Sequence, residues 1–168
     1  MLLVQGQLEK LQTLGGSLDL HAGQFVDRVG VRLGLPFPAG PQLELLAKEG
    51  RRGGVIFPAP ARGCDLSFGG PESQAARAIE QGAKREDVAL AVFTAIGRGL
   101  VKVLQKAGSQ HGIASVLFVG GVTANGIIRS YLEEKLPGFD LHFASPRYCA
   151  DNAAGVAVAA REACGCTE

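Results

Sequence analysis

The chain has 168 residues, of which 46% are hydrophobic and 20% are charged, a composition typical of one globular domain with a substantial core. Seventeen basic and 16 acidic residues give a formal net charge of +1, so the overall charge does not indicate a nucleic-acid or membrane partner. The adjacent basic pairs Arg51-Arg52 and Lys84-Arg85 leave room for a locally basic face, although solvated loop charges are the simpler interpretation.

The apolar run at Met1 to Gln5 is too short for a signal peptide and lacks a basic lead, and no apolar stretch approaches the length of a membrane span. We therefore expect a cytoplasmic protein without a membrane partner. A chain of this size folds without disulfides, so reduced thiols are expected at Cys64, Cys149, Cys164 and Cys166. The last two lack the second ligand pair of a zinc finger and do not predict a metal site.

The first part of the chain predicts two short strands, over residues 2–5 and 8–14, followed by a helix. Apolar residues recur there at helical spacing: Phe25, Val26, Val29 and Leu33. Gly34 and Pro36 end this helix, and Asp27 lies on it about two turns from the end.

A rigid turn is predicted at residues 38–41, Pro-Ala-Gly-Pro, and a short helix at 42–49. The irregular stretch that follows contains candidate strands at 55–57 and 65–68, which would form a loop-rich hairpin.

Two helices are predicted next, over residues 71–81 and from 85 to about 107. The second is the longest, and its apolar stripe is expected to lie in the core. A strand at 140–143 and a closing helix at about 152–163 end the pattern. The order of elements predicts a single α/β domain, with a mixed sheet and flanking helices.

The segment VLFVGGVTANGIIR contains an apolar strand at Val116 to Val119, expected to be buried on both faces. Gly120 and Gly121 end the strand and let backbone amides approach a ligand, and Thr123 is expected to cap a helix that runs to about Lys135. The unpaired amides of that first turn would make an anion site. The alternative is an ordinary tight connection of an α/β protein.

Polar or glycine positions stand at other junctions, where ligands collect in open α/β sheets: Asp27, Gly40, Asn125 and Asp151. Each also has a purely structural explanation as a cap or turn residue. The three histidines are far apart and the Gly-x-Ser-x-Gly motif is absent, so neither a zinc protease nor a serine hydrolase is indicated.

Four stretches occur in an order that is similar to one known family: GSLDLHAGQFVDRVGVRLGLPFPAGP, LSFGG, GGVTANGIIR and YCADNAAGVAVA. They resemble the Asp-Asp-Ala-x-Gly-Glu-x-x-Asp-Lys helix, the Pro-Gly-Gly-Pro turn, the Ser-Phe-Ser-Gly strand, the Gly-Gly-Val-x-x-Asn loop and the Cys-Thr-Asp-Asn cap of the TsaD family. These are tRNA threonylcarbamoyladenosine-modification proteins, also known by the older names O-sialoglycoprotein endopeptidases and glycoproteases. The resemblance runs from about Thr13 to Cys164.

This resemblance implies a ribonuclease-H-like lobe of the actin-like ATPase (ASKHA) superfamily, in which two lobes clasp a nucleotide. The chain corresponds to the carboxyl-terminal lobe, with the amino-terminal lobe and its metal histidines absent. By the same resemblance, Gly120 and Gly121 lie beside an adenylate, Asp27 and Asn125 bond its ribose or base, Gly40 lines the pocket, and Asp151 is a metal ligand.

The implied reaction transfers threonylcarbamoyl from an adenylate to the N6 amine of an adenosine in tRNA. The implied cofactors are ATP or threonylcarbamoyl-adenylate and a divalent metal (Fe, Zn or Mg), both needing the other lobe for a full site. The implied partners are TsaB-like or other tRNA-modification proteins, with tRNA held through a larger assembly. A homodimer through surfaces left bare by the missing lobe is a further expectation.

Several positions depart from the family pattern: Leu20, Gln24, Arg28, Ala39, Gly69 and Ala150. Three functions therefore stay open. The chain is part of a threonylcarbamoyl transferase that is inactive alone, or a non-catalytic paralogue that serves as a nucleotide-binding scaffold, or, least supported, a glycoprotease.

Overall fold

The computed structural model describes residues 3–5 and 12–145, which form five α-helices, a 3₁₀ turn and three two-stranded sheets. The helices are α1 (Ala22–Arg32), α2 (Gly40–Ala47), α3 (Gly69–Glu80), α4 (Arg85–His111) and α5 (Gly126–Lys135). The strands are β1 (Leu3–Gln5), β2 (Gln12–Gly15), β3 (Ala61–Arg62), β4 (Asp65–Leu66), β5 (Ser115–Phe118) and β6 (Asp140–Phe143). The α/β class predicted from the sequence is confirmed.

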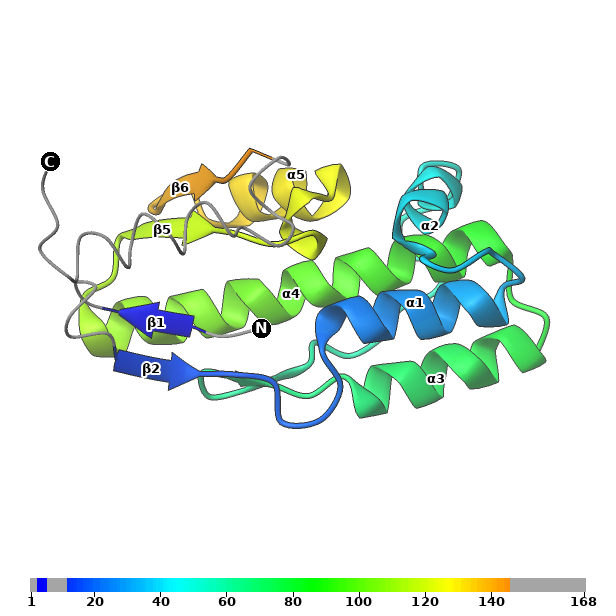
Figure 1. Ribbon diagram of the computed structural model, residues 1–168, viewed down its shortest axis with the longest axis horizontal. Helices are drawn as coiled ribbons and strands as arrows, with labels where there is room; N and C mark the ends of the chain where they lie inside the picture. The colour runs from blue at the N-terminus through cyan, green and yellow to red at the C-terminus, as the bar shows by residue number, and fades with distance from the viewer. Residues whose placement is uncertain (1–2, 6–11, 146–168) are drawn as a thin grey trace, which may run out of the picture.

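Helix α4 is the centre of the fold and runs the length of the molecule (Figure 1). Its buried residues point in several directions, among them Val88, Ala89, Ala91 and Phe93, as expected of a helix covered on several sides. Gly112, with φ of 67°, ends it in the left-handed conformation, so the helix extends four residues beyond the predicted end. No described helix is long and apolar enough to cross a membrane.

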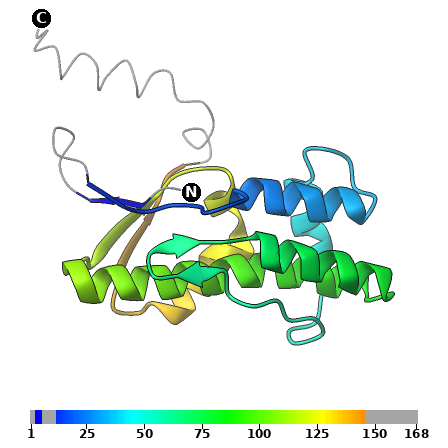
Figure 2. The same ribbon diagram turned by 90° about the horizontal axis from the view of Figure 1, so that it is seen from below.

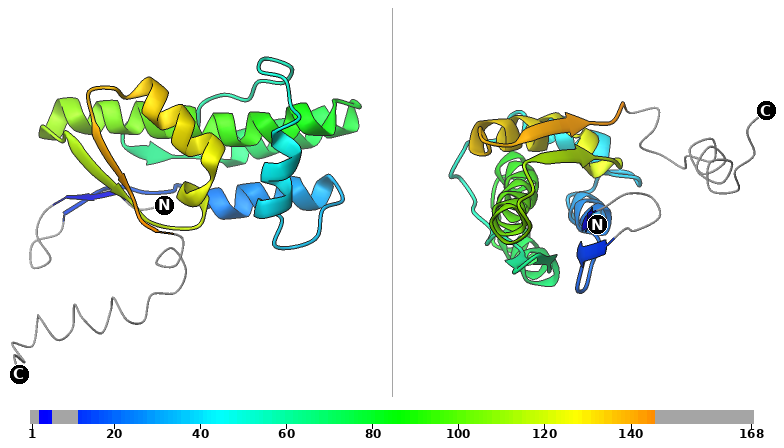
Figure 3. Two further views of the ribbon diagram at one scale, coloured as in Figure 1. Left: turned by 90° about the horizontal axis from the view of Figure 1, so that it is seen from above. Right: turned by 90° about the vertical axis from the view of Figure 1, so that its left-hand side faces the viewer.

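The other helices pack around α4. Helices α1 and α3 lie side by side along one half of it, while α5 and the β5–β6 pair lie along the other half (Figure 1). Helices α2 and α5 cross α4 at different points along its length (Figure 3). The core between these layers contains Phe25, Phe68 and Phe93, and the rings of Phe25 and Phe68 stack with centroids 5.7 Å apart.

The strands form separate pairs rather than the one mixed sheet that the sequence predicted, within the described residues. Strands β1 and β2 are antiparallel, as are β3 and β4, whereas β5 and β6 are parallel and joined through α5. Strand β5 is buried on one face only: Phe118 is 7% exposed but Leu117 is 65% exposed. The expectation of burial on both faces was therefore wrong.

The irregular central segment forms a smaller hairpin than predicted. Residues 55–57 are not a strand, and β3 pairs with β4 against the middle of α4 (Figure 2). The chain after β2 runs along β4, with Leu18 N donating to Leu66 O at 2.8 Å. Gly15 is required there because a Cβ would lie 2.1 Å from Cys64 O.

Helix boundaries differ modestly from the predictions. Helix α2 begins at Gly40 and so includes half of the predicted turn, with the Phe37–Pro38 bond in the cis form. The closing helix predicted at 152–163, and Asp151 before it, lie outside the described residues. Cys64 is a free thiol, and the other three cysteines also lie outside the described range.

Candidate functional site

The first predicted pair, Asp27 and Gly40, is brought together by a hydrogen bond from Ala39, the residue before Gly40, to Asp27. Asp27 Oδ1 accepts from Ala39 N at 2.8 Å, which fixes the entry to α2 against the side of α1. Gly40 is the first residue of α2, and a Cβ there would lie 3.9 Å from Val26 Cγ1. The second oxygen of Asp27 makes no hydrogen bond with the described residues, so it is available to a ligand hydroxyl.

The second predicted group, Gly120, Gly121 and Asn125, forms the turn between β5 and α5. Gly120 has φ of 119°, a conformation that favours glycine, and Gly121 is exposed with open space beside it. Asn125 is 6% exposed and caps α5, with Oδ1 accepting from Ile128 N at 3.0 Å. Asn125 is therefore the helix cap, and the prediction that Thr123 would be the cap was wrong.

Thr123 lies in the 3₁₀ turn Val122–Ala124 instead, where Oγ1 donates to Gly120 O at 2.9 Å. Its hydroxyl is turned back toward the glycine turn, and it cannot reach the first-turn amides of α5 from there. Asn125, two residues later, has the extended backbone of a helix cap (φ −63°, ψ 127°).

One hydrogen bond and one close approach of the backbone bring the two predicted groups near each other. Glu44 lies one helical turn after Gly40, and its Oε1 accepts from Gly126 N at 2.8 Å. A Cβ at Gly23, one turn before Asp27, would lie 3.8 Å from Val122 Cγ2. The start of α1 and the middle of α2 therefore lie beside the segment 122–126, which follows the Gly120-Gly121 turn.

This arrangement changes the predicted chemistry of the α5 terminus. The amides of Gly126 and Ile128 already donate to Glu44 and Asn125, so the terminus holds the chain's own acceptors and not an external anion. Carboxylates at Asp27 and Glu44 are acceptors for hydroxyl and amine hydrogens. The face is therefore suited to the sugar or base of a nucleoside and unsuited to its phosphates.

Three positioning residues were missed by the sequence analysis. Glu44 could have been found from its spacing of four after Gly40, which places both on one side of a helix. Arg129 ties the turn to β6, with Nε donating to Thr123 O at 3.0 Å and its guanidinium 4.9 Å from the Phe143 ring centre. Asp19, the third, links α1 to α3.

The Asp19 carboxylate accepts four hydrogen bonds, three of them from the start of α3. Oδ1 accepts from Phe68 N and Leu20 N, each at 2.7 Å, and Oδ2 accepts from Ser67 Oγ at 2.7 Å and Gly69 N at 3.0 Å. Desolvation raises the pKa of Asp19, but these four donors together outweigh it and hold the pKa below 3.8. The LSFGG stretch is thus fastened to the segment that leads into α1.

Two departures from the family pattern have structural roles here. Gln24 Oε1 accepts from His21 N at 3.0 Å, the bond that a glutamate at this third helical position would also make. Leu20 is partly buried and packs on the core. The substitution at Gln24 therefore preserves the start of α1, although it removes a charge.

An open hollow of about 410 Å³ lies beside Asp27, between α1 and the loop that contains Phe37. Arg28, Arg32 and Glu72 also line it, and Phe37 is 76% exposed at its edge. A larger groove, of about 660 Å³, starts at Glu44 and Gly126 and extends away from the predicted residues.

The described residues contain no group of three His, Cys, Asp or Glu side chains that could hold a metal ion. Asp151, the predicted metal ligand, lies outside them, and its role stays a prediction.

Comparison with known proteins places the chain in a family. The family model described as "tRNA N6-adenosine threonylcarbamoyltransferase", TsaD, matches residues 1–158. The tRNA N6-adenosine threonylcarbamoyltransferase of Methanopyrus kandleri is 34% identical over 150 residues, which cover 88% of this chain and 43% of that protein. A probable bifunctional tRNA threonylcarbamoyladenosine biosynthesis protein of Thermoplasma volcanium is 33% identical over 152 residues, covering 89% of this chain and 29% of that one.

Among solved structures, HypF of T. kodakarensis matches with a TM-score of 0.67 and 20% identity, over 84% of this chain and 20% of that one. At this identity the likeness concerns the fold alone. The chain spans less than half the length of the Methanopyrus and Thermoplasma relatives. Since the family model covers all but the last ten residues, the chain belongs to the TsaD family.

Proposed function

We propose that the chain is the nucleoside-binding lobe of a tRNA threonylcarbamoyltransferase, with the ribonuclease-H-like architecture of the actin-like ATPases. The observation that carries the proposal is the way α1, α2 and α5 are joined: Asp27 of α1 holds the start of α2, and Glu44 of α2 holds the start of α5, which follows the Gly120-Gly121 turn. The membership of the TsaD family supplies the reaction class.

In this proposal the lobe binds an adenylate by its nucleoside end. The free oxygen of Asp27 accepts from a ribose hydroxyl, while the backbone at Gly120 and Gly121 lies against the base or sugar without side-chain obstruction. Asn125 and Arg129 hold this turn in place. The complete enzyme would then transfer threonylcarbamoyl to the N6 amine of a tRNA adenosine, releasing AMP.

Binding is tested by titrating ATP and adenosine into the chain in a calorimeter, with Asp27→Asn as the variant. The carbonyl oxygen of asparagine can still accept from Ala39 N, but its NH₂ group then stands where the free oxygen of Asp27 was, and the negative charge is lost. A charge-assisted hydrogen bond contributes about 1.5–3 kcal/mol, so affinity should fall by about tenfold or more. Glu80→Gln, at the end of α3, is the control and should bind as the wild type does.

Absence of any nucleoside binding by the wild-type chain would overturn the proposal. A second assay separates the catalytic proposal from the scaffold alternative. The chain is supplied with a separately produced amino-terminal TsaD lobe and with TsaB-like and other tRNA-modification proteins, and threonylcarbamoyl transfer to tRNA is measured. Nucleoside binding without transfer would favour a non-catalytic scaffold, which the loss of charge at Gln24 supports.

A further inference from the structure

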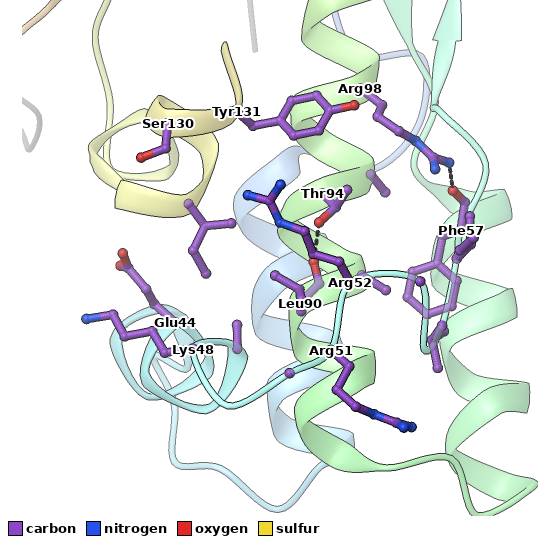
Figure 4. Close-up of a pocket in the computed structure, with 18 of the residues that line it drawn as sticks. Glu44, Lys48, Arg51, Arg52, Phe57, Leu90, Thr94, Arg98, Ser130 and Tyr131 are labelled. Atoms are coloured by element: carbon purple, nitrogen blue, oxygen red, sulfur yellow. Dashed lines mark hydrogen bonds between the residues drawn. The ribbon is translucent and has the colours of Figure 1, made fainter. Parts of the chain in front are cut away.

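The groove that begins at Glu44 and Gly126 has no role in the proposed nucleoside binding. It lies between α2, α5 and the segment 50–57, and α4 forms its floor (Figure 4). Its volume, about 660 Å³, is that of a ligand site rather than a packing defect.

Basic side chains are concentrated around this groove. Five basic residues line it: Lys48, Arg51, Arg52, Arg98 and Lys135. Only two acidic residues do so, Glu44 and Glu134. This excess of three positive charges at one groove contrasts with a net charge of +1 for the whole chain, so the positive potential is local.

The arginine pair found in the sequence stands on a firmly held loop. Asp87, 4% exposed at the start of α4, accepts from Arg51 N at 2.8 Å and from Arg51 Nη2 at 3.1 Å. The Arg51 backbone amide, and then its guanidinium, hold the pKa of Asp87 below its usual value. Gly50 and Gly54 allow the loop to lie close against α4, because a Cβ at either position would lie 2.4 Å from an atom in the first turn of that helix.

This anchoring leaves Arg52 and Lys48 to face solvent at the groove. The Arg52 side chain is 86% exposed and extends across the groove, with Glu134 Oε2 3.7 Å from its Nη1 (Figure 4). Lys48, on the opposite side, makes no hydrogen bond or ion pair through its side chain with the described residues. Lys48 is therefore available to a phosphate, and Arg52 can exchange its long, exposed ion pair with Glu134 for a phosphate.

Apolar and aromatic side chains also line the groove, and the aromatic ones are Phe57 and Tyr131. Leu90, Ala91 and Ile127 line it, and Tyr131 packs directly over Gly97, where a Cβ would lie 2.8 Å from Cδ1 of the ring. The Tyr131 hydroxyl points toward Arg98, whose guanidinium donates to Phe57 O (Figure 4). Basic groups beside an aromatic and apolar floor are the combination that binds single-stranded nucleic acid, by charge and by stacking.

We propose that this groove binds single-stranded RNA, namely the nucleotides that flank the adenosine to be modified. This inference rests on the proposed function, because a polynucleotide that delivers one base to a site must continue over an adjoining surface. The groove adjoins the site directly: Glu44 and Gly126, bonded to each other, belong to both. Phosphates would pair with Lys48 and Arg52, and a base would stack on the Tyr131 side; Lys135 is held by Glu134 at 2.7 Å.

The test measures binding of a fluorescein-labelled RNA hairpin, with an adenosine in its loop, by fluorescence anisotropy. The variant is the double substitution Lys48→Gln and Arg52→Gln. The control is Lys102→Gln and Lys106→Gln, which removes the same charge from exposed positions of α4 outside the groove.

Two lost phosphate contacts should reduce the slope of log affinity against log salt by about 1.4. Raising the salt from about 50 to 200 mM weakens RNA binding by some factor, and that factor should be about sevenfold smaller for the groove variant than for the wild type. At the lower salt the groove variant should bind RNA about tenfold more weakly than the wild type. The control should stay within about twofold of the wild type. Equal effects of the two double variants, or none, would overturn the proposal.

Two further measurements identify the source of a failure. Calorimetric ATP affinity should be unchanged in the groove variant; absence of ATP binding in the wild type overturns the proposed function, whereas intact ATP binding with unchanged RNA binding overturns only this inference. Photocrosslinking of a 4-thiouridine hairpin should label peptides 48–57 or 126–135. Labelling confined to other surfaces would overturn the assignment of RNA to this groove.

Discussion

Removing the Asp19 carboxylate should destabilise the fold, because this one side chain accepts hydrogen bonds from three donors at the start of α3. The Phe68 amide is partly buried, so leaving it without an acceptor costs about 1–2 kcal/mol, and the three more exposed donors, which water can reach, add a few tenths each. Asp19→Ala should therefore lower the free energy of unfolding by about 2–3 kcal/mol. Because each kcal/mol lost lowers the midpoint of thermal unfolding by about 2–4 °C, that midpoint should fall by about 4–12 °C.

Asp19→Asn should have a smaller effect, of about 1–2 kcal/mol. The amide oxygen can still accept from Phe68 N, but the NH₂ group then faces Gly69 N, a donor. Glu80→Gln, at the end of α3, also replaces a carboxylate with an amide and should leave the free energy of unfolding unchanged. Urea denaturation followed by circular dichroism measures all three variants.

The effect of Asp19 should also depend on pH with a definite sign. Because the folded-state pKa is lowered from 3.8, the stabilisation is fully present above that value and is lost as the pH falls through the folded-state pKa. The difference between the wild type and Asp19→Asn should therefore narrow below about pH 4. A difference that stays constant down to about pH 3, or variants as stable as the wild type at about pH 7, would refute the argued role of the carboxylate.

Three other predictions concern the candidate face. Gly120→Ala places a side chain at φ of 119° and should cost about 1–3 kcal/mol in thermal unfolding, whereas Gly70→Ala, in the open first turn of α3, should be neutral or stabilising. Asn125→Ala removes the α5 cap and should cost about 1–2 kcal/mol by urea denaturation, while Asn125→Asp keeps an acceptor for Ile128 N and should cost less. Adenosine and ATP should bind the chain within about threefold of each other in calorimetry, because the acceptors of this face suit the nucleoside; a preference of about tenfold or more for ATP would contradict that reasoning.

The helices could be predicted from the sequence because their signals are local. Phe25, Val26 and Val29 are fully or nearly buried on α1, as their spacing indicated, and Gly34, with φ of 77°, follows its end. The strands could be predicted less well. Residues 55–57 have the apolar composition of a strand, but Arg51, bonded to Asp87, fastens the preceding loop to α4, and Phe57 is instead buried beside that helix. Tertiary contacts of this kind leave no periodic signal.

The candidate face could be predicted in its members but not in its chemistry. Asp27, Gly40 and the Gly120-Gly121 turn were all identified, and in the structure Asp27, in the middle of α1, accepts from the residue before Gly40, while the glycine turn leads into α5. The role of these residues in binding stays a prediction. Asp151 lies outside the described residues, and the expected metal, partner proteins and homodimer also stay predictions.

The α5 terminus shows why the local motif was insufficient. A strand, two glycines and a helix predict free amides and a positive dipole, which favour an anion. The residue that occupies the first of those amides, Glu44, is 82 positions away in the sequence. Its carboxylate neutralises the terminus and repels a phosphate placed there, so a nucleotide on this face must turn its phosphates away. The same bond holds α2 and α5 together at the mouth of the basic groove, so one carboxylate stands between the face that we propose binds a nucleoside and the groove that we propose binds RNA.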